Sequence, residues 1–290
     1  MDRQNAKLKL WGHRGCRGLG MPPENSLPAF SAAIAGGADG VELDLFLTRD
    51  EQLVVFHDER LEDLSSGYGQ LESHRLDELR SVKLRAYDGS FWDETIPTLS
   101  EVLDLIDAWR HSALLDDRQR GRATDFVVNI ETKGLGTTRF VAAEVERRLA
   151  SGWDYRNFQN SSFDMRTLKE MRRLLPQLPI GALFEGPIGR PETPWDVTPD
   201  ELQFCIGQLG DIHPESINIT LPSLRHPSAL EIIRQSGSRP IAWTASEVPP
   251  ERVPAHERKE LIRFLAENDI ILITDYPAAM KMLEQSYKTL

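Results

Sequence analysis

Short apolar runs alternate with amphipathic helical stretches from one end of this chain to the other, and this alternation is the strongest constraint on its fold. Eight runs have the length and composition of β-strands, and they cover residues 8–12, 41–45, 126–131, 159–163, 180–184, 216–219, 240–243 and 270–274. Repeated strand-then-helix order is the pattern of a parallel sheet. Eight such strands are the number that closes an α/β barrel.

Three of the intervening helices carry clear start signals. Ser26 precedes Pro28 and an apolar stretch, so a helix there would be capped by the serine hydroxyl. Thr98 and Glu101 have the spacing of a capping box, and the apolar residues that follow recur on one helical face. Asp164 is placed to cap a further helix. These signals support the strand–helix alternation independently of the apolar pattern.

A ninth apolar run, residues 53–57, does not fit the parallel order. It follows the second strand after too few residues for a parallel crossover, which needs about a dozen. It is therefore predicted to return as an antiparallel hairpin outside the eight barrel strands. The polar stretch 58–92 is interpreted as an insertion, and residues 111–125 as a solvated loop. The chain 1–290 is thus predicted to be one domain, a TIM (β/α)8 barrel of the α/β class with a small insertion after the second barrel strand.

Composition excludes several classes of partner. Of the 290 residues 40% are hydrophobic, yet no apolar run approaches the roughly 20 residues of a membrane span. The formal net charge of -11 is opposite to that of a nucleic-acid-binding surface. Two cysteines far apart, Cys16 and Cys205, do not indicate a disulfide framework. Because no apolar signal-peptide core precedes the first strand, a cytoplasmic location is expected; the oligomeric state is left open.

Residues with catalytic chemistry gather just beyond the carboxyl ends of strands, where α/β barrels build their active sites. His13 and Arg14 lie in a glycine-rich turn after the first strand, and Glu24 follows a short loop later. His57 ends the returning hairpin strand, which can bring a second histidine over the same mouth. A guanidinium offers a rigid fork for phosphate oxygens, and two histidines suit general acid–base chemistry.

Three carboxylates point to a cation site at the same mouth. Glu42 and Asp44 are two apart on a strand, so their side chains face the same way. Glu131 adds a third carboxylate from the next barrel strand. Close carboxylates that stay ionised at neutral pH need a compensating cation. Oxygen-only ligands suit Mg²⁺, Mn²⁺ or Ca²⁺ better than zinc.

Each of these features alone has a commoner structural explanation. A single histidine at a strand end is more often structural than catalytic, and a Glu-x-Asp pair is more often a surface feature or an ion pair. Their co-location at one end of one barrel favours a site that combines acid–base groups with a Lewis acid. Trp243, which ends the seventh barrel strand, is about equally consistent with lining a pocket and with the barrel core.

The ordered set of motifs resembles the glycerophosphodiester phosphodiesterase family, from about residue 8 to about residue 280. The matching motifs, in the family's order and spacing, are His13-Arg14-Gly15, Glu24-Asn25, Glu42-x-Asp44, His57-Asp58, Ile96-Pro97-Thr98-Leu99 with Glu101, Glu131-Thr132-Lys133, Ser162-Phe163-Asp164, Trp243-Thr244 and Ile273-Thr274-Asp275-Tyr276-Pro277. Two positions depart from the family pattern. Thr132 replaces an apolar residue, and residues 63–66 replace an arginine followed by threonines, which bears on how the insertion packs and which leaving group it accepts.

The resemblance implies a metal-dependent hydrolase that converts glycerophosphodiesters, small-molecule substrates, to glycerol 3-phosphate and an alcohol. It implies that Glu42, Asp44 and Glu131 hold one divalent cation, Mg²⁺, Ca²⁺ or Mn²⁺. It also implies that His13 and His57 are the acid–base pair, acting through a cyclic phosphate formed by the glycerol 2-hydroxyl.

The resemblance further implies which residues contact the substrate. Arg14 and Lys133 are expected to bind the phosphate, and Glu24 to lie close to the metal. Trp243 is the candidate for a pocket wall. Three alternatives to the favoured reaction stay open. One is the same chemistry on lysophospholipids, which needs an apolar groove for the acyl chain. The second is a related lyase that stops at the cyclic phosphate, and the third is an inactive binding protein on the same barrel.

Overall fold

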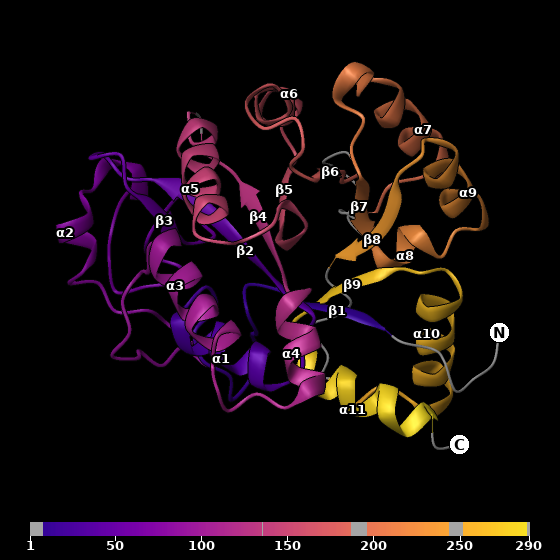
Figure 1. Cartoon of the computed structure of the whole chain (residues 1–290), viewed down its shortest axis with the longest axis horizontal. Coiled ribbons are helices and arrows are strands. Elements are labelled where there is room, and N and C mark those ends of the chain that lie inside the picture. Colours follow the sequence, from indigo (N-terminus) through magenta and orange to yellow (C-terminus); the bar gives the residue numbers. More distant parts are fainter. Residues whose placement is uncertain (1–7, 135, 187–195, 244–251, 289–290) are drawn as a thin grey trace.

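The computed structural model describes residues 8–134, 136–186, 196–243 and 252–288, and it has nine strands in these ranges (Figure 1). Eight of them are parallel to their barrel neighbours. The strands are β1 Lys9–Gly12, β2 Gly40–Leu47, β3 Leu53–Val55, β4 Val127–Thr132, β5 Phe158–Ser162, β6 Ile180–Leu183, β7 Ser216–Thr220, β8 Arg239–Trp243 and β9 Ile271–Thr274. Each predicted strand is present to within two residues, which confirms the alternation read from the sequence.

The parallel strands close into a barrel in the order β1, β2, β4, β5, β6, β7, β8, β9 and back to β1. Closure is made by β1, in which Gly12 pairs with Val41 on one side and Thr274 on the other. The short β3 lies outside the closure and pairs antiparallel with β2, with Leu45 opposite Val55. The predicted TIM barrel and its hairpin are both confirmed.

Helices surround the barrel, as Figure 1 shows. They are α1 Leu27–Ala35, α2 Leu76–Leu79, α3 Leu99–Arg110, α4 Asp117–Thr124, α5 Thr138–Ala150, α6 Met165–Leu174, α7 Pro199–Gly207, α8 Leu221–Leu224, α9 Pro227–Gln235, α10 Ala255–Glu267 and α11 Pro277–Lys288. The three predicted caps are confirmed, because the side chains of Ser26, Thr98 and Asp164 accept backbone N–H groups at the starts of α1, α3 and α6.

The interpretation of residues 111–125 as a solvated loop was wrong, because α4 occupies most of them. Asp116 and Gln119 form a capping box at its start, and Ala123 is its buried residue. Arg122 donates to the backbone oxygens of Ile34 and Ala38 at 2.7 and 2.9 Å. Capping and one long polar side chain hold α4 in place. The helix lacks the apolar face by which helices are recognised in a sequence, so the sequence pattern did not indicate it.

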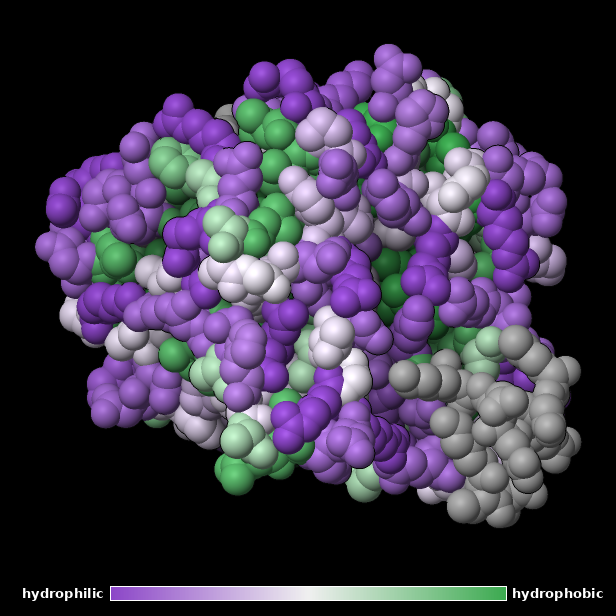
Figure 2. Space-filling model, in the orientation of Figure 1, coloured by the Kyte–Doolittle hydropathy of each residue, from purple (hydrophilic) through white to green (hydrophobic). Residues whose placement is uncertain are grey.

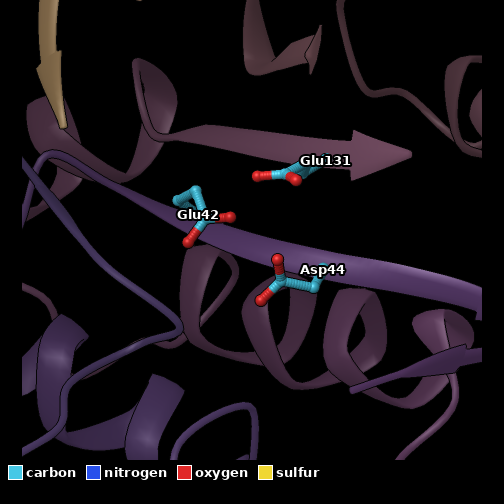
Figure 3. Close-up of side chains that lie close together, drawn as sticks. All are labelled: Glu42, Asp44 and Glu131. Carbon is cyan, nitrogen blue, oxygen red and sulfur yellow. The ribbon is translucent and has the colours of Figure 1, made fainter. Parts of the chain in front are cut away.

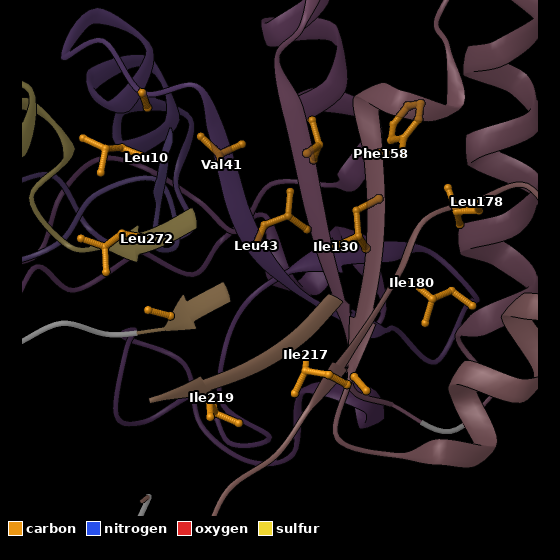
Figure 4. Close-up of a cluster of buried hydrophobic side chains, with 14 of the residues drawn as sticks. Leu10, Val41, Leu43, Ile130, Phe158, Leu178, Ile180, Ile217, Ile219 and Leu272 are labelled. Carbon is orange, nitrogen blue, oxygen red and sulfur yellow. The ribbon is translucent and has the colours of Figure 1, made fainter. Parts of the chain in front are cut away.

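The outward face of the barrel carries the main apolar core, which packs against the helices (Figure 4). The inward face is divided. On the β8, β9 and β1 side it is apolar, with Trp11, Ile241, Ile271 and Ile273 forming a separate buried cluster.

On the β4 to β7 side the inward face is polar instead. Asn129, Gln159, Ser161, Ser216 and Asn218 are buried there. Four of these five have a side-chain atom without a hydrogen-bond partner in the described chain: Asn129 Oδ1, Gln159 Nε2, Ser161 Oγ and Asn218 Nδ2. Buried polar atoms of this kind are satisfied by ordered water in globular proteins. The interior is therefore polar from β4, which carries Glu131, round to β7.

The insertion 58–92 packs around a small apolar core of its own. It contains α2, a 3₁₀ turn at Leu71–Ser73 and three isolated antiparallel bridges, Arg60–Gln70, Ser65–Leu84 and Arg85–Phe91. The core members, shared with β2, β3 and the segment before α3, are Phe46, Val54, Phe56, Leu61, Leu71, Leu79, Leu84 and Ile96. The insertion is thus attached to the hairpin that carries His57.

In the described ranges, no helix has both the length and the apolar character that crossing a bilayer requires. The face drawn in Figure 2 is mostly hydrophilic, with hydrophobic residues in scattered small groups.

We expect Ile217→Ala to destabilise the barrel. Ile217 is fully buried in β7 against the helix layer, and such truncations lose about 2–5 kcal/mol of unfolding free energy. Leu114→Ala is the control, because Leu114 is 93% exposed and its loss should change stability by less than about 0.5 kcal/mol. Urea unfolding measures both, and equal midpoints for the two variants would contradict the assignment of this core.

Candidate active site

The predicted site residues other than Trp243 converge at the carboxyl ends of β1, β2, β3 and β4. Glu42 and Asp44 lie on β2, and Glu131 lies on β4 directly opposite Asp44 in the parallel register. One carboxylate oxygen from each of the three lies within 4.8 Å of the others. Figure 3 shows the three side chains pointing toward one another. The spacing of the acidic residues along the strands therefore produces a compact cluster of oxygen ligands.

The pKa shifts of these three carboxyl groups indicate that the protein's own positive charges do not compensate all of them. Burial raises the pKa of Glu42 well above its usual range, and the carboxylates of Asp44 and Glu131 raise it further. Burial also raises the pKa of Glu131. Burial would raise the pKa of Asp44 too, but the Lys133 and Arg14 charges hold it well below the usual range. The protein's own cations thus stabilise one carboxylate of the three, and a hard divalent ion suits the whole set.

Lys133 and Arg14 reach the acidic cluster from opposite sides. Lys133 Nζ lies 3.0 Å from Asp44 Oδ1 and 3.6 Å from Glu131 Oε1. Arg14 Nε lies 3.4 Å from Asp44 Oδ2, and the Arg14 backbone N–H donates to Glu42 Oε2 at 3.0 Å. Two cations beside a carboxylate cluster are an arrangement that can neutralise a bound phosphate.

Glu24 lies beside the arginines and is not one of the three converging ligands. Its Oε1 accepts from Arg14 Nη1 at 2.5 Å, and its Oε2 lies 3.1 Å from Arg17 Nε. Its neighbour Asn25 donates from Nδ2 to Asp44 Oδ2 at 2.8 Å. Glu24 therefore orients the guanidinium groups, while Asn25 orients a cage carboxylate.

The turn that carries these residues is conformationally strained. Arg14 and Asn25 both have positive φ angles, 50° and 57°, and the Asn25 backbone N–H donates to the Arg14 oxygen at 2.9 Å. Non-glycine residues rarely adopt this region and cluster at functional sites. Gly15, with φ of 80°, packs so closely on Ala29 that an added Cβ would lie 2.7 Å from its backbone carbon.

Each candidate histidine is hydrogen-bonded to a carboxylate. His13 Nδ1 lies 2.6 Å from Asp275 Oδ1, and His57 Nδ1 lies 2.5 Å from Asp58 Oδ1. A carboxylate at Nδ1 favours the tautomer that leaves Nε2 for the site. Burial lowers the pKa of His13 and so does Arg14, while Asp275 opposes both. A neutral imidazole is available at this position near neutral pH.

Asp275 stands in one of the quoted motifs, but sequence reasoning gave it no role of its own. It directly follows β9, so the rule that singled out the other strand ends applies to it as well. Asn25 and Arg17 were likewise given no individual role. They are recognisable only once the folded turn brings them to Asp44 and Glu24.

Trp243 lies at the end of β8, across the barrel order from β4. Its Nε1 donates to the backbone oxygen of Asn218 at 3.2 Å. Its ring packs edge-to-face against Phe163, with ring centroids 6.1 Å apart. Phe163 is 41% exposed, so this aromatic pair is partly open to solvent. Thr244, the other residue of that motif, lies outside the described residues. Cys16 is buried, and burial with the Asp275 charge raises its pKa to about 12, which leaves the thiol unreactive.

Two hollows border the cluster. The larger, of about 470 Å³, is lined by Phe46, His57, Asp58, Glu59, Gln70, Glu72, Lys133 and Gly134. The smaller, of about 320 Å³, is lined by Arg17, Pro22, Glu24, Asp63, Leu64, Arg85, Ala86, Tyr87 and Gly89. The insertion contributes a wall to each, so it shapes the entrance on both sides.

Comparison with known proteins assigns this arrangement to a family. The model of the glycerophosphoryl diester phosphodiesterase family matches residues 13–279. A glycerophosphodiester phosphodiesterase from Caldanaerobacter subterraneus is 32% identical over 227 residues, which are 77% of this chain and 80% of that protein. One from Bacillus altitudinis is 30% identical over 192 residues, 63% of this chain and 69% of that protein.

Solved structures share the fold. A phosphodiesterase from Oleispira antarctica, in complex with the product sn-glycerol-3-phosphate, has a TM-score of 0.69 at 21% identity, with 96% of each chain covered. A glycerophosphoryl diester phosphodiesterase from Parabacteroides distasonis has a TM-score of 0.67 at 20% identity, covering 97% of this chain and 88% of that one.

We expect Mg²⁺, Mn²⁺ or Ca²⁺ to raise the melting temperature of protein stripped with EDTA. An ion that binds the folded state alone, at 100 times its Kd, adds about 2.7 kcal/mol of stability. The shift should shrink as the pH falls, because the raised pKa of Glu42 lets protons compete with the ion. Differential scanning calorimetry at several pH values measures the shift in melting temperature.

Glu131→Gln should lose the metal-induced shift, since it removes one of the three ligands. Glu257→Gln, at an exposed position of α10, removes the same charge and should keep it. An identical shift in both variants would show that the ion binds elsewhere.

Proposed function

The chain belongs to the glycerophosphoryl diester phosphodiesterase family and is a glycerophosphodiester phosphodiesterase, and on that premise we propose that it cleaves its substrate at the mouth of the barrel to release glycerol 3-phosphate and an alcohol. The observation that carries this proposal is the convergence of three kinds of group at one mouth. They are three carboxylates, two histidines hydrogen-bonded to carboxylates, and the positively charged side chains of Arg14 and Lys133. The bound product in the Oleispira protein supports the same product here.

In this proposal Glu42, Asp44 and Glu131 hold one divalent cation. When bound, the ion supplies Lewis-acid stabilisation of charge on the phosphate oxygens. Arg14 and Lys133 bind the same phosphate group, because they already flank the cage at hydrogen-bonding distance. Their positive charges stabilise the transition state, because they are already positioned beside the non-bridging oxygens on which negative charge develops.

His13 and His57 divide the proton transfers between them. In the first step one imidazole takes the proton of the glycerol 2-hydroxyl, whose oxygen attacks phosphorus, and the other gives a proton to the departing alcohol oxygen. In the second step the imidazole that gave up its proton takes one proton from a water, whose hydroxyl joins phosphorus. The bond between phosphorus and the glycerol 2-oxygen breaks, and the other imidazole returns its proton to that oxygen. Asp275 and Asp58 hold the rings by Nδ1 during both steps.

The walls of the larger hollow do not suit the acyl chain of a lysophospholipid. Phe46 is its one apolar side chain, and the other lining residues are charged, polar or glycine. An acyl chain would lose apolar contact there. The barrel and its insertion are proposed to work as one domain, since the insertion borders both hollows of the site.

We expect wild-type protein to release glycerol 3-phosphate from glycerophosphocholine with Mg²⁺, Mn²⁺ or Ca²⁺ and to stop when EDTA is added. His13→Ala should lower kcat by about 10²–10⁴-fold, the usual contribution of a general acid or base. His111→Ala is the matched control, because His111 is an exposed histidine at the end of α3. Coupled assay of glycerol 3-phosphate measures both, and full activity of His13→Ala would refute its role.

Asp275→Asn should lower kcat about tenfold or more, because it removes the carboxylate that holds His13. It should also move the pH limb set by His13 to lower pH. The carboxylate raises the pKa of His13, so its loss lets burial and Arg14 lower that pKa further. Asp211→Asn, an exposed carboxylate, serves as the control. A purely structural role for Asp275 would lower activity without moving the limb.

A further inference from the structure

Thr132, the last residue of β4, lies between two residues of the proposed site. Glu131 precedes it as a member of the carboxylate cluster, and Lys133 follows it, with its Nζ 3.0 Å from Asp44. Residues two apart on a strand face the same way, so Glu131 and Lys133 share the inward face and Thr132 faces outward. The backbone at Thr132 therefore sets the direction of both site side chains.

The two strands beside β4 hold Thr132 in different ways. On the β2 side the paired register includes it, with Thr132 opposite Leu45. On the β5 side the paired register ends one residue earlier, with Glu131 opposite Ser161. The connection between Thr132 and β5 is made by side chains instead.

Asn160 on β5 makes most of this connection. Its Nδ2 donates to Thr132 Oγ1 at 2.7 Å and to the backbone oxygen of Ile130 at 3.0 Å. A carbonyl oxygen only accepts, so the amide nitrogen must be the atom that faces Ile130. Ser162 adds a third bond, from its Oγ to the backbone oxygen of Thr132 at 2.9 Å. The end of β4 is thus fixed to β5 on both sides of Glu131.

Asn160 is an amide in a layer that is otherwise largely apolar. It is 1% exposed on the outward face of β5, where Phe158 on the same strand and Ile180 opposite it on β6 belong to the main core. A buried amide costs free energy that its hydrogen bonds must offset, whereas an apolar side chain there would have no such cost. Both hydrogen-bond partners of its Nδ2 belong to the three residues of β4 centred on Glu131. The contacts of this amide therefore concern the part of β4 that carries the site.

We propose that Asn160 is a positioning residue for the phosphodiesterase reaction, acting through Thr132 and Ile130 to hold Glu131 toward the cation and Lys133 toward the phosphate. The inference rests on the proposed function and adds to it a residue outside the mouth. Asn160 faces outward, so it contacts neither substrate nor cation. It acts by fixing the backbone from which both site side chains extend.

Binding of Mn²⁺, followed by the electron paramagnetic resonance signal of the free ion, tests this proposal. Asn160→Ala removes both hydrogen bonds and should raise the Kd for Mn²⁺ by about tenfold, as for other groups that orient metal ligands. Asn157→Ala is the matched control. Asn157 is equally buried, and its Nδ2 also donates to two backbone oxygens, those of Thr124 and Phe126 at 2.8 and 3.1 Å, but at the amino ends of β4 and β5. It should lower the melting temperature at least as much and leave the Kd unchanged.

Thr132→Val provides a second variant if Asn160→Ala does not fold, because it keeps the branched shape and removes only the hydroxyl. It should also weaken Mn²⁺ binding, though less, since the bond from Asn160 to Ile130 remains. An unchanged Kd in the folded variant would overturn the proposal, and so would an equal rise in Asn157→Ala.

Activity of the wild type separates this inference from the proposed function. If wild-type protein binds Mn²⁺ but does not hydrolyse glycerophosphocholine, while Asn160→Ala alone weakens the binding, the proposed function is refuted and the positioning of Glu131 is kept. If wild-type protein does not bind Mn²⁺, the cation site and the role of Asn160 are both refuted.

Discussion

Three carboxylates within one another's reach, two of them buried and Glu131 half-buried, are the constraint on which the rest of this mouth depends. Like charges in a low-dielectric setting raise the free energy of the folded state unless cations compensate them. Lys133 and Arg14 reach Asp44, Asn25 donates to it, and burial still leaves Glu42 with a raised pKa. The strained turn at Arg14 and Asn25 follows from the same need, because it brings a guanidinium and an amide to the acidic cluster.

Barrel closure arranges these groups in the right order. β9, β1, β2 and β4 are consecutive, so Asp275, His13, the β2 carboxylates and Glu131 follow one another around a single arc of the mouth. The inward face below is apolar on the β8 to β1 side and polar on the β4 to β7 side. The site arc and the polar side of the interior therefore meet at β4, which carries Glu131.

Much of this could be predicted from the sequence, because its causes are local. Strand alternation, caps and the Glu-x-Asp spacing depend on neighbours within a few residues. The role of Asp275 could not be predicted in this way, because its contact with His13 spans 262 residues and exists only once the barrel closes. Helix α4 was missed for a different reason, because it has no apolar face that a sequence pattern can reveal. Its stability comes from Asp116, Gln119 and Arg122, and not from an apolar stripe.

The hairpin that holds His57 lies outside the barrel's closure, and that position has an evolutionary consequence. The insertion starts at residue 58, immediately after His57, and its residues line both hollows beside the site. The carboxylate cage is fixed by the β2–β4 register and does not involve the insertion. Substitutions in the insertion can therefore diversify which alcohols are accepted while the phosphate chemistry is inherited unchanged. The short tether to His57 limits that freedom, because a shifted insertion would move a catalytic candidate with it.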